Sequence, residues 1–226
     1  MQLSIPLLIL KFKKHVLIFS MVFIQVVLIQ RAFASNADAP WDLVHDDEGI
    51  VVETKLVDGS DVRAFRAMTT IDASMDAIID ILMTPASCTK WIHNCSLGRS
   101  LEKGDATNVY SYQVSDMPWP SSDRDIVLRL ELVDFAEGKK VRMNSVSGLV
   151  PDESYHRIEK SNGYYELIPE EPGRTSVTWF QHTELGGNVP AWLINQLIVD
   201  LPLNSLINLR KLASSSQKTL QTFASE

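Results

Sequence analysis

The 226-residue sequence lacks the short motifs of common catalytic and phosphate-binding sites. It has no Gly-x-Ser-x-Gly elbow, no His-Glu-x-x-His pair and no glycine-rich phosphate loop. His93, His156 and His182 stand outside any nucleophile motif, so we expect each to be a surface or loop residue. No catalytic residue, metal ligand or cofactor is therefore predicted.

The chain also lacks a hydrophobic run as long as a typical membrane span. Its main uncharged apolar run, residues 16–29, is well short of the ~20 residues that span a bilayer comfortably. Three lysines precede this run and the small-x-small sequence Ala-Phe-Ala at residues 32–34 follows it. This order predicts a secretory signal peptide over residues 1–34, cut after Ala34, and hence a periplasmic or secreted protein. An uncleaved membrane anchor is the alternative, and a lipoprotein anchor is excluded because no cysteine follows the run.

Cysteine is scarce, since Cys88 and Cys95 are the only two. An export signal would place both in an oxidising compartment, and their even count and close spacing favour one disulfide. So short a loop is stabilised by at most ~2–3 kcal/mol. Two free thiols are one alternative. The other is a zinc site with His93 as third ligand, although the fourth ligand is missing and the spacing fits no zinc pattern.

Positive charge is in deficit, with 21 Lys and Arg against 28 Asp and Glu and a net charge of -7. Residues 1–34 hold four of the basic residues and no acidic ones, so their removal lowers the net charge to -11. An acidic surface of this size argues against nucleic acid as a partner and against tight adhesion to anionic membranes. We expect a soluble monomer.

No internal repeat is visible, and the length suits one domain, residues 35–213. In residues 126–135, Ile126, Leu128 and Leu130 alternate with Arg129 and Glu131, which is typical of a strand with one buried face. Helices segregated from a run of antiparallel strands indicate an α+β fold. The predicted strands are residues 50–57, 62–71, 95–101, 108–115, 126–135, 139–147, 163–168 and 175–184, and the first predicted helix is residues 75–83.

The second predicted helix, residues 190–212, is apolar almost all round as far as Leu203 and must be packed on more than one side. Pro202 removes a backbone donor, which predicts a kink or break and a lid of two hinged segments. Gly186 and Gly187 form a second candidate hinge. The Ser-rich residues 214–226 are predicted to be a flexible, unstructured tail.

Three segments resemble the START family, named for the steroidogenic acute regulatory protein. Residues 117–125, Met-Pro-Trp-Pro-Ser-Ser-Asp-Arg-Asp, resemble its PWP-x-x-x-RD segment. Residues 185–195, Leu-Gly-Gly-Asn-Val-Pro-Ala-Trp-Leu-Ile-Asn, resemble the start of its C-terminal helix, and Trp-Ile-His-Asn-Cys at residues 91–95 resembles its Trp-x-x-x-Cys stretch. They stand in the family's order, and the likeness covers about residues 41–212.

The resemblance implies a helix-grip fold, a curved antiparallel sheet wrapped around a long C-terminal helix with an internal tunnel. It also implies binding and transfer of a lipid or other hydrophobic small molecule, with transient membrane contact. Sterol carriers of the family bury an acid–arginine pair in the tunnel. In this sequence the positions of the acid and the arginine fall near Ser111 and Leu130, and neither residue is charged. Arg129 is one residue out of register and should face the opposite side of the sheet, so a sterol held in that way is not expected.

Candidate ligand contacts come from the central strands and the long helix. Each candidate also has an alternative role that involves no ligand. The aromatic residues could simply pack in the core, and Gln196 could be a solvent-exposed residue. Arg124 could pair with Asp125 and fix the edge of a strand. Trp119 and Trp179 are further aromatic candidates for the tunnel wall or for a cage around a choline-like cation. The predicted contacts are Tyr110, Tyr112, Arg124, Leu128, Leu130, Met143, Phe180, Trp192, Leu193, Gln196, Leu197 and Leu201.

Two other functions remain open. A helix-grip enzyme of the cyclase or dehydratase type, acting on an aromatic or polyketide-like substrate, would need an inward-facing acid or histidine. A buried, unpaired Glu166 or His182 in the tunnel would support that function. An interaction module is the third possibility, and its cavity would be filled by side chains alone, whereas a ligand site needs several hundred Å³.

Overall fold

A computed structural model describes residues 40–151, 154–187 and 189–224. The predicted signal peptide, residues 1–34, lies outside this part of the chain. The strands are β1 (Asp42–Asp47), β2 (Ile50–Lys55), β3 (Ala64–Ile71), β4 (Cys95–Gly104), β5 (Asn108–Ser115), β6 (Arg124–Phe135), β7 (Gly138–Ser145), β8 (His156–Arg157), β9 (Lys160–Glu171) and β10 (Arg174–Glu184). The helical elements are α2 (Met75–Leu82), η3 (Pro85–Ser87), α3 (Cys88–Trp91) and α4 (Ala191–Ala224).

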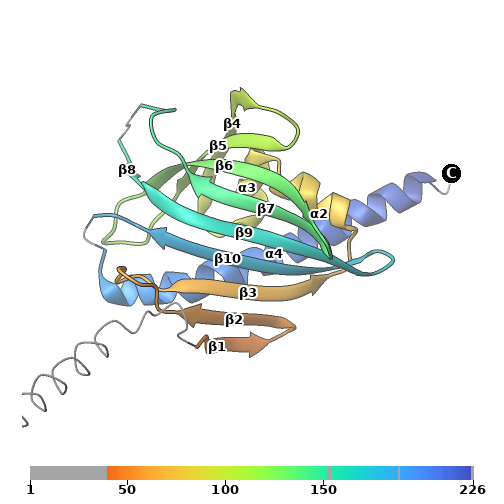
Figure 1. Cartoon of the computed structure of the whole chain (residues 1–226), viewed down its shortest axis with the longest axis horizontal. Coiled ribbons are helices and arrows are strands. Elements are labelled where there is room, and N and C mark those ends of the chain that lie inside the picture. Colours follow the sequence, from red (N-terminus) through yellow and green to blue (C-terminus); the bar gives the residue numbers. More distant parts are fainter. Residues whose placement is uncertain (1–39, 152–153, 188, 225–226) are drawn as a thin grey trace, which may run out of the picture. The chain divides into compact units, whose positions relative to one another are not determined.

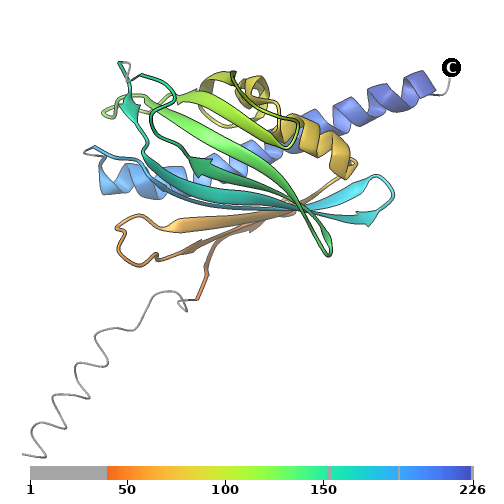
Figure 2. The ribbon, with the colours of Figure 1, turned by 45° about the horizontal axis from the view of Figure 1, so that its top comes forward.

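Nine of these strands form one antiparallel sheet in the order β1-β2-β3-β10-β9-β7-β6-β5-β4, and β8 pairs in parallel with β6. The long helix α4 runs along the inner face of the curved sheet (Figures 1 and 2). It packs against β2 and β3 and, on another side, against α2 and α3. This arrangement confirms the predicted α+β helix-grip fold.

Local sequence explains the short helical segment between β3 and β4. Ser74 caps α2 by accepting a hydrogen bond from the backbone N–H of Ala77 at 3.3 Å. Ile78, Ile79 and Leu82 form its buried face. Pro85 cannot continue α2 and instead begins η3, which leads directly into α3.

Two strands were not predicted. β1 has the sequence Asp-Leu-Val-His-Asp-Asp and is almost wholly exposed, so it carries no alternation of buried and exposed residues. It forms an edge of the sheet and pairs only with β2 among the described strands. β8 has two residues and is too short for any periodic signal. Both strands are held in the sheet by pairing with a neighbouring strand rather than by burial of one face.

The long helix differs from the prediction in two ways. It does not end at Pro202 but continues to Ala224, so the two hinged segments predicted there are one helix. The helix is packed on both sides of the proline, because Leu193 before it and Leu206 and Leu209 after it are 0% exposed, and Pro202 is itself buried. The prediction of an unstructured segment from Ser214 is likewise wrong for residues 214–224, which are helical.

Buried side chains gather on both faces of the sheet. The main core lies on the inner face, where residues from β2, β3, β6, β7, β9 and β10 meet α2, α3 and α4. A second, smaller cluster lies on the outer face and consists of Tyr112, Val114, Val127 and Val150. Because neighbouring residues of a strand face opposite ways, Val127 belongs to the outer cluster and Leu128 to the main core.

Candidate functional site

A cavity of about 160 Å³ lies between the inner face of the sheet, α3 and the first turns of α4. Most of its wall is apolar. Ile126, Leu128 and Leu130 reach it from β6, and Met143 reaches it from β7. They share a face because β6 and β7 are paired in register, with Leu130 opposite Met143.

The helix α4 supplies one side of the cavity. Ile194, Leu197, Ile198 and Leu201 line it. Their spacing of three and four residues puts them on one face of a helix. The predicted contacts Leu197 and Leu201 therefore lie at the cavity, together with Arg124, Leu128, Leu130 and Met143.

The other helix residues predicted to contact a ligand do not line the cavity. Leu193 is fully buried outside the cavity lining, Trp192 is 56% exposed and Gln196 is also exposed. The predicted ligand contacts were spread over several faces of this helix. The observed lining is one narrow stripe, because α4 turns its remaining faces to its neighbours and to solvent.

Tyr110, Tyr112 and Phe180 also lie away from the cavity. The Tyr112 hydroxyl donates a hydrogen bond to Asp125 Oδ2 at 3.0 Å within the outer cluster. Tyr110 is two residues away on the same strand and so shares that face. Phe180 stacks on Tyr164 at 5.2 Å between ring centroids. The pattern of alternation separates two faces but does not say which one is inner.

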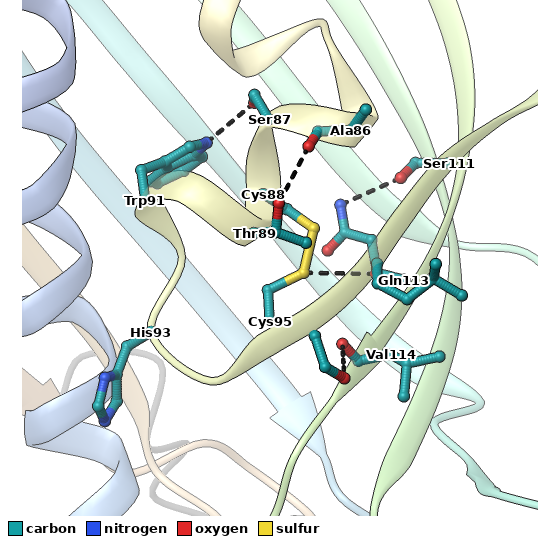
Figure 3. Close-up of a disulfide and its surroundings, with 12 residues drawn as sticks. Ala86, Ser87, Cys88, Thr89, Trp91, His93, Cys95, Ser111, Gln113 and Val114 are labelled. Carbon is teal, nitrogen blue, oxygen red and sulfur yellow. Dashed lines mark hydrogen bonds between the residues drawn. A yellow bond between two sulfur atoms is a disulfide. The ribbon is translucent and has the colours of Figure 1, made fainter.

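The aromatic wall of the cavity comes largely from residues that the sequence did not single out. Phe65, Trp91 and Tyr165 line it together with Trp179, and all four are at most 5% exposed. Phe65 and Tyr165 belong to alternating strands, so the correct face assignment would have found them. Trp91 stands in the Trp-x-x-x-Cys stretch, and its indole N–H donates to Ser87 Oγ at 3.1 Å (Figure 3).

Uncharged polar groups form a second part of the wall. Gln181 receives a hydrogen bond from the Trp179 indole at 3.1 Å and donates to Ser161 at 3.2 Å and to Thr183 at 2.9 Å. Across the cavity, Gln113 donates to Ser111 Oγ at 3.0 Å. These amide and hydroxyl groups satisfy one another, so they make a neutral and ordered surface.

Arg124 is a buried cation at the end of the cavity where β10 leads into α4, and it is 2% exposed. Its guanidinium donates to the carbonyls of Leu185 at 3.0 Å and Gly186 at 3.3 Å, and also to the carbonyl of Ser122. Burial lowers the pKa of Arg124 although the charge of Asp123 opposes this, and an arginine remains protonated. The predicted pairing with Asp125 does not occur, because that carboxylate is bound by Arg157 on the opposite face.

The two positions at which the family resemblance directed attention to an acid–arginine pair are uncharged and buried in this chain. Ser111 is 0% exposed and Leu130 is 3% exposed. Arg129 faces away from the cavity, donates to Asn108 Oδ1 at 2.6 Å and pairs with Glu131 at 3.3 Å.

The acids and histidines named for an enzyme lie elsewhere. Glu166 forms an ion pair with Lys140 at 2.9 Å, and His182 is hydrogen-bonded to Ser60 Oγ at 3.1 Å. Neither is a cavity-lining residue. His93 lies in the loop between α3 and β4, in keeping with the expected surface or loop position, and it also lines the cavity.

Cys88 and Cys95 form a disulfide that joins α3 to the start of β4, with their Cα atoms 5.9 Å apart (Figure 3). Cys88 contributes to the cavity wall. The disulfide agrees with the prediction. With both sulfur atoms in this bond, neither cysteine can act as the thiolate ligand that the alternative zinc site requires. In the described part of the chain, no group of three or more His, Cys, Asp or Glu residues is placed to hold a metal ion. None of the helices in this part has the length and apolar character to cross a membrane.

Comparison with known proteins gives a consistent result. The family model described as "START domain" matches residues 33–201. An uncharacterized protein of Pseudomonas aeruginosa is 36% identical over 183 residues, which are 80% of this chain and 90% of that protein. The crystal structure of a STAR-related lipid transfer protein from Xanthomonas axonopodis is similar with a TM-score of 0.70 and 31% identity, over 76% of this chain and 97% of that one. Human StAR-related lipid transfer protein 5 shares the fold at 17% identity and a TM-score of 0.70, over 91% of this chain and 99% of that one.

Proposed function

This chain belongs to the START family, and from that premise we propose that its cavity binds a lipid or other apolar ligand and carries it between membranes. The observation that carries the proposal is the apolar cavity itself, walled by the sheet, α3 and α4. The 31% identical relative from Xanthomonas is named as a lipid transfer protein, which supports the same role. Burial of apolar ligand surface would supply binding free energy at ~25 cal/mol per Å².

The cavity must open to admit a large ligand. Its volume of about 160 Å³ is below the ~300–1,000 Å³ of most ligand pockets. The first turns of α4 are the part of the wall best able to move, because Trp192, Asn195 and Gln196 are exposed there. Gly186 and Gly187, both at φ of 64°, lie just before these turns and are a suitable hinge.

We place the polar head of the ligand beside Arg124. A guanidinium has five N–H donors, and three hydrogen bonds to carbonyls leave two of them for a ligand. Gln113 and Gln181 border the same cavity and add neutral donors and acceptors. An amphipathic ligand could thus direct its head toward Arg124 and its apolar part toward the aromatic wall.

Two exposed tryptophans support transfer at a membrane surface. Trp119 is 88% exposed and Trp192 is 56% exposed. Their segments lie close together, because Arg124 at the start of β6 binds the carbonyls just before α4. Tryptophan favours the membrane–water interface.

We expect the double variant Trp119→Ala/Trp192→Ala to lose most binding to zwitterionic phosphatidylcholine vesicles. Leu43→Ala, an exposed residue of β1, serves as the control.

We further propose that the protein works outside the cytoplasm. The Cys88–Cys95 disulfide supports this location, because disulfides persist in oxidising compartments. Cell fractionation with a C-terminal tag tests it. Recovery of the tagged chain from the cytoplasm, with residues 1–34 still attached, would contradict the proposal.

The central test is ligand capture. The protein is purified from a lipid-rich extract, examined by native mass spectrometry and titrated with a pyrene-labelled fatty acid. Leu197→Trp should fill the cavity and reduce binding at least tenfold, since its side chain lines the cavity. The neighbouring Gln196→Trp adds the same bulk at an exposed position and should bind normally. The absence of both a copurified lipid and probe binding would reject the carrier role.

A further inference from the structure

Four aromatic rings pack together in the cavity wall. The centroid of Trp179 lies 5.0 Å from Phe65, 5.1 Å from Tyr165 and 6.1 Å from Trp91, and Trp91 lies 5.9 Å from Tyr165. The four residues come from β3, α3, β9 and β10. We call Phe65, Trp91, Tyr165 and Trp179 the aromatic cluster.

The polar atoms of the aromatic cluster are paired, with one exception. The indole N–H of Trp91 donates to Ser87, and that of Trp179 donates to Gln181, each at 3.1 Å. The Tyr165 hydroxyl makes no hydrogen bond to any residue that the structure describes, although its side chain is only 3% exposed. Among the described residues, the fully enclosed side-chain atoms without a hydrogen bond are Ser121 Oγ and Arg210 Nε, so the Tyr165 hydroxyl keeps contact with open space. Because Tyr165 lines the cavity, its hydroxyl is open toward the cavity.

The surroundings of Tyr165 suit a neutral group. The charged side chains among the described lining residues are Arg63, Asp116 and Arg124. They stand at strand ends or in loops, whereas Tyr165 lies within β9 opposite Trp179. Burial raises the pKa of Tyr165 well above its ordinary value of 10.0, so the hydroxyl stays protonated and can both donate and accept.

The aromatic cluster does not form a cage for a cation. A quaternary ammonium sits ~6 Å from each ring that surrounds it. Here the rings are in contact with one another, with centroids between 5.0 and 6.1 Å apart, and leave no such space among them. A ligand anion would also be costly at this position, because a buried charge needs a partner charge or several hydrogen bonds.

We propose that the Tyr165 hydroxyl is a ligand-binding subsite for an uncharged oxygen, either a hydroxyl or a carbonyl, within the apolar part of the ligand. This inference rests on the proposed carrier function and narrows its ligand class. Plain hydrocarbon chains fill the cavity without using this group. Oxygen-bearing molecules gain one hydrogen bond there.

Two probes that differ by one oxygen test the subsite. Binding of 2-naphthol and of naphthalene is measured by calorimetry at pH 7 for the wild type and for Tyr165→Phe. The variant should bind 2-naphthol about fivefold to tenfold more weakly, the effect of one hydrogen bond, and naphthalene equally well. The control Tyr164→Phe changes the adjacent residue, which stacks on Phe180 away from the cavity, and should bind both probes as the wild type does.

The outcomes separate the subsite from the carrier function. Equal 2-naphthol affinity in the wild type and in Tyr165→Phe would overturn the subsite alone. Failure of the wild type to bind either probe, or any lipid, would overturn the carrier function and the subsite together. The ligand-free protein adds a second readout. Tyr165→Phe should melt no lower than the wild type, because the hydroxyl that it removes has no partner, and a clear fall in Tm would contradict the inference.

Discussion

Arg157 and Asp125 form a two-point ion pair on the outer face of the sheet. Nε and Nη2 of Arg157 donate to Oδ1 and Oδ2 of Asp125, each at 2.8 Å. The Asp125 side chain is 1% exposed and that of Arg157 is 14% exposed. The Tyr112 hydroxyl donates to the same carboxylate at 3.0 Å. The pair ties β8 to the start of β6, one residue from the cavity-lining Arg124.

Asp125→Asn should destabilise the protein by about 3–5 kcal/mol, because it leaves a buried guanidinium without its carboxylate. Urea denaturation at pH 7 measures the change. The ion pair of Lys139 and Asp134 provides a control, since Asp134 is 82% exposed and Asp134→Asn should destabilise the protein far less than Asp125→Asn. Similar losses in the two variants would show that burial of the Asp125 pair has no special effect.

The same carboxylate predicts a loss of stability in acid. Burial raises the pKa of Asp125, but the hydrogen bonds from Arg157 and Tyr112 and the charge of Arg157 lower it further, to below the ordinary 3.8. The unfolded chain therefore binds this proton at a higher pH than the folded chain does. The stabilisation is complete above the unfolded pKa of about 3.9 and is lost as the pH falls through the folded value. Urea midpoints from pH 6 to pH 2 should fall less steeply in Asp125→Asn than in the wild type.

Most of the fold was predictable because the sheet repeats a simple pattern. In β6, Leu128 and Leu130 alternate with the less buried Arg129 and Glu131, as predicted, whereas Val127 is buried on the other face in the outer cluster. The exceptions have physical reasons. β1 buries no face, and the packing of Leu206 and Leu209 holds α4 together beyond Pro202 despite the missing N–H. Local propensity alone predicts a break there because it omits this packing.

The candidate site was predictable only in part. A two-residue period assigns Leu128 and Val127 to opposite faces but does not say that the face of Leu128 is inner. The wrong choice for β5 and β10 selected Tyr112 and Phe180 and missed Gln113 and Gln181, which lie one residue away and line the cavity. The bond network of Arg124 depends on the carbonyls of Leu185 and Gly186, about sixty residues away in sequence, and no local pattern indicates it.

Gly98 allows β4 to approach η3 and the disulfide. A Cβ at this position would lie 2.2 Å from the carbonyl oxygen of Pro85 and 2.4 Å from Sγ of Cys88. Gly98→Ala should therefore destabilise the protein by about 1–3 kcal/mol through overpacking. Thermal unfolding measures the effect, and Ser100→Ala, at an exposed position of the same strand, should change stability by less than ~0.5 kcal/mol. An unchanged Tm in Gly98→Ala would mean that β4 is not held this close.

Pro202 should set the rate at which the first turns of α4 open. It lies inside the helix and cannot donate the hydrogen bond to the carbonyl of residue 198, which leaves the helix weaker at this point. Pro202→Ala restores that bond. The restored bond strengthens a turn of α4 beside the cavity, and a gain of about 1 kcal/mol should slow ligand exchange about fivefold with little change in affinity. Stopped-flow transfer of a pyrene-labelled fatty acid to vesicles measures the rate.

Pro190→Ala is the matched control, because a proline that precedes the first helical turn removes no helix hydrogen bond. Equal exchange rates in the two variants and the wild type would show that opening does not depend on the turn at Pro202 and would leave the proposed hinge at Gly186 and Gly187 to be tested by substitution.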